Sequence, residues 1–133
     1  FYLARAVLPG MAARGFGRII HISGRDGFVP KENRAHNVTA KAGLHALAKA
    51  IALEFGPRGV TANTIAPGIV DTRRDPASHP GMAEEIARRL GGIPVRRIGR
   101  PEEIAGACLW LCGPQGGYVT GQLLNMSGGE FMW

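Results

Sequence analysis

The chain has 133 residues, 45% of them apolar and 20% charged, a composition typical of a globular domain and unlike that of a disordered tail or a fibre. Its formal net charge is +6, but the thirteen arginines are scattered rather than gathered in a basic arm, so the charge does not argue for nucleic-acid binding. No apolar run approaches the roughly 20 residues of a membrane-spanning helix. We therefore expect neither nucleic acid nor a membrane as a partner.

The first predicted elements are a helix, a strand and a second helix. Apolar residues at helical spacing predict a helix over residues 2–14, which we expect Pro9 to kink or interrupt. The β-branched run Arg18–Ile22, bounded by glycines, predicts a strand buried on both faces. An apolar stripe then predicts a helix from about Arg34 to Phe55, where a Gly-Pro pair ends it.

The second half of the chain continues this alternation. Val60–Ile65 predicts a buried strand, and an amphipathic pattern predicts a helix over Met82–Leu90. A proline followed by two glutamates predicts a helix that begins at Pro101 and runs to about Cys112. Gln122–Met126 predicts a third strand. Strands that alternate with helices indicate an α/β fold with a parallel sheet, and because three strands are few for such a sheet, we expect further strands upstream of the chain.

Several single residues have a structural interpretation. Cys108 and Cys112 lie one helical turn apart, which is poor geometry for a disulfide, and two ligands cannot complete a zinc site. We therefore expect two small buried cysteines, no metal site and a cytoplasmic location. His21 is predicted to be a packed core histidine, His45 a structural or exposed residue, and Asn63 a residue that binds backbone groups.

Six short stretches follow one another along the chain at the separations seen in one protein family: Gly17–Ser23, Ala40–Leu44, Arg58–Asn63, Ala66–Gly68 with Thr72, Gly99–Ala105 and Val119–Gln122. Together they resemble the short-chain dehydrogenase/reductase family, and within it the 3-oxoacyl-acyl-carrier-protein reductase type. The resemblance implies the C-terminal half of a Rossmann-type doubly wound parallel sheet, with three strands and flanking helices. It also implies that the phosphate-binding, N-terminal half of a single NAD(P)-binding domain lies upstream of Phe1.

The resemblance implies hydride transfer between a nicotinamide cofactor, NADP or NAD, and a carbonyl carbon. In the family a tyrosine delivers the proton, a serine hydrogen-bonds the substrate oxygen, and a lysine one helical turn after the tyrosine lowers its pKa and binds the nicotinamide ribose. Lys41 matches the lysine. Asn37 stands in the place of the tyrosine, and Gly24 in the place of the serine.

Other groups close to these positions could take part in proton transfer. The amide of Asn37 can donate a hydrogen bond to a carbonyl oxygen but cannot act as an acid at neutral pH. His36 has a suitable pKa, although it lies about 100° around the helix from Asn37, and Asp26 could orient it. The alternative is a helix-start histidine at the surface. Ser23 is either a further candidate or a hydrogen-bonded residue at a strand end. We take Lys41, Asn37 and His36 as the candidate catalytic residues.

The candidate cofactor-binding residues follow from the same resemblance. Lys41 would contact the ribose, and the turn after the second strand would meet the nicotinamide and phosphate through four residues: Pro67, Gly68, Val70 and Thr72. Residues 73–100 hold seven arginines, in the region that forms a mobile lid in the family. A basic lid suits an acidic carrier protein, a coenzyme A phosphate or a substrate carboxylate; alternatively, the arginines form a solvated helix face balanced by Asp71, Asp75, Glu84 and Glu85.

Two functions fit these residues. The first is an NAD(P)-dependent oxidoreductase with atypical acid–base residues that acts on a carbonyl or alcohol, such as a 3-oxoacyl thioester, in a homodimer or homotetramer. The second is a catalytically inactive family member that binds nucleotide or stabilises an oligomer. A different reaction on the same scaffold is a third, because a fold does not fix its chemistry.

Overall fold

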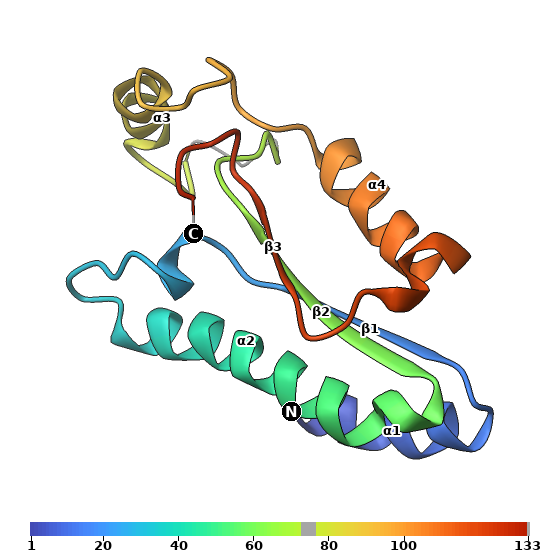
Figure 1. The fold of residues 1–133 in the computed structure, drawn as a ribbon. Coiled ribbons are helices and arrows are strands. Elements are labelled where there is room, and N and C mark those ends of the chain that lie inside the picture. Colours follow the sequence, from blue (N-terminus) through green and yellow to red (C-terminus); the bar gives the residue numbers. More distant parts are fainter. Residues whose placement is uncertain (73–76, 133) are drawn as a thin grey trace.

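The computed structural model describes residues 1–72 and 77–132 and contains one parallel sheet of three strands (Figure 1). The strands are β1 (Gly17–Ile22), β2 (Val60–Pro67) and β3 (Leu123–Met126). β2 lies in the centre and pairs in parallel with both neighbours. The α/β class and the parallel sheet are thus confirmed.

Helices cover both faces of this sheet. α1 (Tyr2–Ala13) and α2 (Ala35–Phe55) lie on one face, α4 (Pro101–Cys112) lies on the other, and α3 (Met82–Leu90) lies apart, beyond the end of the strands (Figure 1). Short 3-10 helices follow β1, α2 and α4. None of the helices within the described ranges is both long enough and apolar enough to cross a membrane. The core on the α1–α2 face is built from small and branched side chains: Ala4, Leu8, Ala48, Ile51, Val60 and Ala62.

Three details differ from the expectations. α1 continues through Pro9, because Ala4 and Leu8 before the proline and Met11 after it all pack against the same core. β1 is only half-buried, and Ile22 is 44% exposed, because β1 forms an edge of the described sheet whereas β2 is buried along almost its whole length. Cys112 is exposed, since its neighbour Leu111 faces the core instead.

The side chain of Asn63 fixes the approach to β3. Asn63 is 2% exposed; its Nδ2 donates to the carbonyl oxygen of Val119 (2.8 Å), and its Oδ1 accepts from the backbone N–H of Gln122 (3.0 Å). The hydroxyl of Thr120 accepts from the backbone N–H of Ala62 (3.0 Å). The predicted structural role of Asn63 is confirmed, and it anchors the C-terminal segment beside the central strand.

Candidate active site

A cavity of about 690 Å³ lies at the carboxyl ends of β1 and β2, between α2 and α4. In parallel sheets this is the edge at which ligands bind. Gly24 lines this cavity. So do six of the seven residues that the sequence analysis predicted as site residues: Asn37, Lys41, Pro67, Gly68, Val70 and Thr72. The seventh, His36, is exposed and does not line this cavity. The structure therefore brings together the candidates on α2 and on the turn after β2, and leaves His36 outside.

Lys41 lies over the end of β1. Its Nζ donates to the carbonyl oxygen of Ile22 (3.1 Å), and its own carbonyl oxygen accepts from the hydroxyl of Ser23 (3.2 Å). Lys41 lies one turn after Asn37 on α2, and both line the cavity. The one-turn spacing places the amide and the ammonium group on the same side of the helix.

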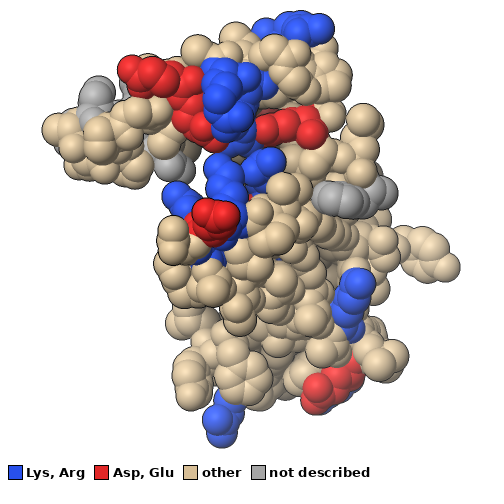
Figure 2. Space-filling view, turned by 90° about the vertical axis from the view of Figure 1, so that its left-hand side faces the viewer, with Lys and Arg blue, Asp and Glu red and all other residues tan. Residues whose placement is uncertain are grey.

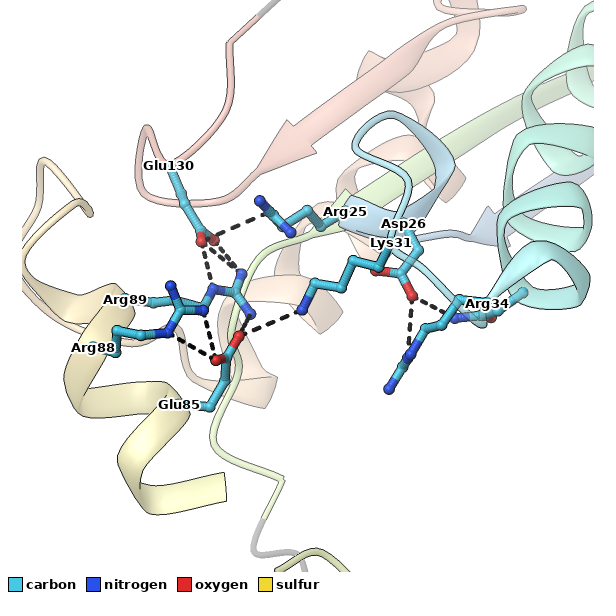
Figure 3. Close-up of polar contacts among 9 residues, drawn as sticks. Arg25, Asp26, Lys31, Arg34, Glu85, Arg88, Arg89 and Glu130 are labelled. Carbon is cyan, nitrogen blue, oxygen red and sulfur yellow. Dashed lines mark hydrogen bonds and ion pairs between the residues drawn. The ribbon is translucent and has the colours of Figure 1, made fainter. Parts of the chain in front are cut away.

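Asn37 has a partner that the sequence analysis missed. Its Nδ2 donates to Oδ2 of Asp26 (2.6 Å), and the same oxygen accepts from Nη1 of Arg34 (3.1 Å). The sequence analysis named Asp26 as a group that could orient His36, but in the described structure its carboxylate binds Asn37 and Arg34 instead (Figure 3). An acidic residue two positions after Gly24 was the only signal in the sequence for this contact.

The two glycines of the cavity differ in what they permit. Gly24 has an extended backbone (φ 167°), and a Cβ added there would meet only the carbonyl oxygen of Pro67, at 4.0 Å. The backbone therefore does not require glycine at this position. A Cβ on Gly68 would lie 2.9 Å from the Cα of Ser127, so the turn after β2 needs a glycine in order to pack on the segment after β3.

A second polar pair lies beneath the cavity. The hydroxyl of Ser23 lies 2.7 Å from Nε2 of His45, and the His45 ring packs against Phe28. Burial lowers the pKa of His45, and the nearby charge of Lys49 lowers it further. Burial also lowers the pKa of His21, against the opposing effect of its contact with the carbonyl of Leu44. Ser23 is thus held toward α2 by its hydroxyl, as a hydrogen-bonded residue at a strand end would be.

On the face of the molecule shown in Figure 2, basic and acidic side chains are interleaved in the upper half of the view. Six charged residues form what we call the ion-pair cluster, which joins the loop after β1, α3 and the segment after β3 (Figure 3): Arg25, Lys31, Glu85, Arg88, Arg89 and Glu130. Arg89 makes the strongest connection, donating to both carboxylate oxygens of Glu130 (2.7 Å each).

The acidic residues that the sequence analysis named balance only part of the positive charge of the arginine-rich segment, residues 73–100. Glu85 pairs with Arg88 (2.6 Å), in agreement with the expectation of a charge-balanced helix face. The other main partners, Glu130 and Glu103, come from outside the predicted set. Arg97 binds Glu103 and, together with the backbone N–H of Arg100, lowers the pKa of that carboxyl to about 2. Residues 73–76, with two of the seven arginines and Asp75, lie outside the described residues.

Comparison with known proteins decides the family. A family model described as enoyl-(acyl carrier protein) reductase matches residues 1–130. The chain belongs to this family of short-chain dehydrogenases/reductases. A crystal structure of a 3-oxoacyl-[acyl-carrier protein] reductase with bound NAD from Brucella melitensis superposes with a TM-score of 0.86 at 30% identity, covering 98% of this chain and 47% of that one. The fold is therefore that of the Rossmann-type short-chain reductases.

Curated members of the short-chain dehydrogenase/reductase family give the same assignment. An acetoacetyl-CoA reductase from Allochromatium vinosum is 43% identical over 132 residues, which cover 99% of this chain and 52% of that protein. The (2S)-[(R)-hydroxy(phenyl)methyl]succinyl-CoA dehydrogenase subunit BbsC from Thauera aromatica is 42% identical over 130 residues, 98% of this chain and 49% of that protein. The chain spans about half the length of the curated relatives it matches.

Proposed function

We propose that this chain is the substrate-side half of an NAD(P)-dependent oxidoreductase that interconverts a carbonyl and an alcohol, with a 3-oxoacyl thioester as the preferred substrate class. The observation that carries the proposal is the cavity at the strand ends, which Asn37 and Lys41 line together with Pro67, Gly68, Val70 and Thr72. The relatives that are named reductases of acetoacetyl-CoA and 3-oxoacyl carrier-protein substrates support the choice of substrate.

We propose that this cavity holds the nicotinamide end of a dinucleotide. The close approach of Gly68 to Ser127 fixes a turn whose residues line the cavity, and Lys41 lines the same cavity from α2. Lys41 would hold the ribose, and the turn would hold the carboxamide. When bound, the nicotinamide supplies or accepts a hydride. Because the chain spans about half the length of its curated relatives, we propose that the phosphates are bound by the half that this chain does not cover.

The residues of this chain would position the substrate more than they would protonate it. The Asn37 amide, oriented by Asp26, can donate its second hydrogen to a carbonyl oxygen. Gly24 adds no donor. Because a missing general acid typically slows a reaction by about 10²- to 10⁴-fold, we expect slow turnover, with the proton coming from water.

The test follows oxidation of NADPH and of NADH by the whole natural protein with 3-oxoacyl thioesters and simple ketones. Wild type is compared with the double variant Gly24→Ser, Asn37→Tyr, since Gly24 has room for a side chain. We expect slow turnover by wild type and a rate at least about 10²-fold higher for the double variant. Lys41→Ala is the control, and should abolish both rates. Absence of turnover in both proteins, with no binding of either cofactor, would refute the proposal.

A second candidate is a non-catalytic subunit that stabilises an oligomer with an active partner. The observation that favours it is the loss of both hydroxyl groups at positions 24 and 37, although the backbone at Gly24 would accept a serine. A relative whose name describes it as a dehydrogenase subunit is consistent with it. Turnover by the double variant alone would support this candidate over the first.

A further inference from the structure

The ion-pair cluster carries more positive than negative charge. It contains four cationic side chains and two carboxylates. Both oxygens of Glu130 accept hydrogen bonds from Arg89, and Glu85 accepts from Arg88 and Lys31. Direct hydrogen bonds within the cluster thus join its two carboxylates to three of its four cations.

Arg25 is the fourth cation of the ion-pair cluster, and it makes no hydrogen bond to either carboxylate. Its Nε lies 4.0 Å from a Glu130 oxygen, too far for a hydrogen bond, and its guanidinium makes no hydrogen bond within the described ranges 1–72 and 77–132. The side chain is only 27% exposed and lines the cavity. The other two cations of the lining have acceptors, since Arg34 binds Asp26 and Lys41 binds the carbonyl of Ile22. A guanidinium without a hydrogen-bond acceptor among the described residues, beside a cavity, suits an anion supplied by a ligand.

The position of Arg25 indicates the side of the cavity on which this anion would lie. Arg25 and Asp26 are neighbours in the chain, yet Arg25 points toward Glu130 and α3, whereas Asp26 points toward α2 (Figure 3). The proposed cofactor contacts come from Lys41 and from the turn after β2. Arg25 belongs instead to the loop after β1, next to Gly24, where an added Cβ would meet only the carbonyl oxygen of Pro67, at 4.0 Å.

We propose that Arg25 binds a carboxylate carried by the substrate, so that the substrate is a thioester of a dicarboxylic acid with its second carboxylate free. The thioester part of this inference rests on the proposed function, whereas the carboxylate part rests on Arg25 alone. The planar fork of the guanidinium matches a carboxylate with two parallel hydrogen bonds, which an ammonium group cannot make. A neutral acyl chain would leave these donors without acceptors.

The test compares succinyl-CoA with butyryl-CoA, which have the same carrier and acyl chain length but differ in the terminal carboxylate. Neither has a 3-oxo group, so binding to the whole natural protein can be measured by calorimetry without turnover. We expect wild type to bind succinyl-CoA about 10- to 100-fold more tightly. Arg25→Ala should remove this preference and leave butyryl-CoA binding unchanged, and Arg25→Lys should keep only part of it.

Lys31→Ala is the matched control, because it removes a charge of the same cluster that does not line the cavity. It should keep the preference, and circular dichroism should show all variants folded. Equal binding of the two thioesters by wild type would overturn the inference. So would an Arg25→Ala variant that loses NADP binding but keeps the preference, since Arg25 would then hold a cofactor phosphate. A preference for succinyl-CoA, together with no turnover of 3-oxoacyl thioesters in the assay described above, would uphold the carboxylate site and refute hydride transfer. Turnover of 3-oxoacyl thioesters in that assay, together with equal binding of succinyl-CoA and butyryl-CoA, would do the opposite.

Discussion

Replacing Glu130 by glutamine should loosen α3 without unfolding the sheet. α3 has no fully buried residue, and its attachment to the segment after β3 depends on the paired hydrogen bonds between Arg89 and Glu130. The two side chains are 17% and 10% exposed, so water screens this ion pair only in part. Glutamine keeps one acceptor and removes the charge, which we expect to cost about 2 kcal/mol of the roughly 3–6 kcal/mol that two charge-assisted bonds contribute.

A loss of about 2 kcal/mol corresponds to roughly a 30-fold faster amide exchange, because each 1.4 kcal/mol is a factor of about ten. Hydrogen–deuterium exchange read by mass spectrometry should show this increase in peptides from Met82–Leu90 and little change in β2. Glu102→Gln is the control, since Glu102 is exposed and has no ion pair within the described residues. Unchanged exchange in α3, or an equal increase in β2, would refute the reasoning.

Three further outcomes are expected. Arg97→Ala should raise the pKa of Glu103 from about 2 toward 4.5, but not fully, because the backbone N–H of Arg100 still donates to the carboxylate; an NMR titration measures this pKa. In wild type, the stability that the Glu103 carboxylate contributes should disappear as the pH falls from 4.5 toward 2. His45 has a lowered pKa, so the free energy of unfolding should fall as the pH drops below 6.5, and urea titrations should show a smaller fall for His45→Gln. Gly59→Ala should destabilise by about 2 kcal/mol or more in thermal unfolding, because Gly59 has φ +76° and its Cβ would collide with the Gly15 carbonyl. Gly43→Ala, in an open position of α2, should instead be neutral or stabilising.

Local signals explain why much of the fold followed from the sequence. The helices Met82–Leu90 and Pro101–Cys112 have the predicted bounds, the second because Pro101 suits the first helical position and the Glu103 carboxylate accepts from the backbone N–H of Arg100. Local signals were insufficient where tertiary packing determines the conformation or burial of a residue: Pro9 remains inside a helix, and Cys112 faces solvent.

The candidate site followed from the sequence where it depends on short spacings, as with Asn37 and Lys41 on one side of α2. The partners of its polar groups did not. Asp26 binds Asn37 across a loop, and Arg25 approaches Glu130 from a position 105 residues earlier in the chain. Periodicity and capping carry no information about such contacts, because they depend on how the loops pack after the sheet has formed.

The contact between Gly68 and Ser127 also has a consequence for the order of folding. β2 pairs with β1 across 43 positions but with β3 across 59, as the pairs Gly17–Val60 and Thr64–Leu123 show. During synthesis, the α1–α2 face can therefore assemble before β3 has been made. The wall of the cavity that Ser127 supports can form only afterwards, so ligand binding should be the last property that the nascent chain acquires.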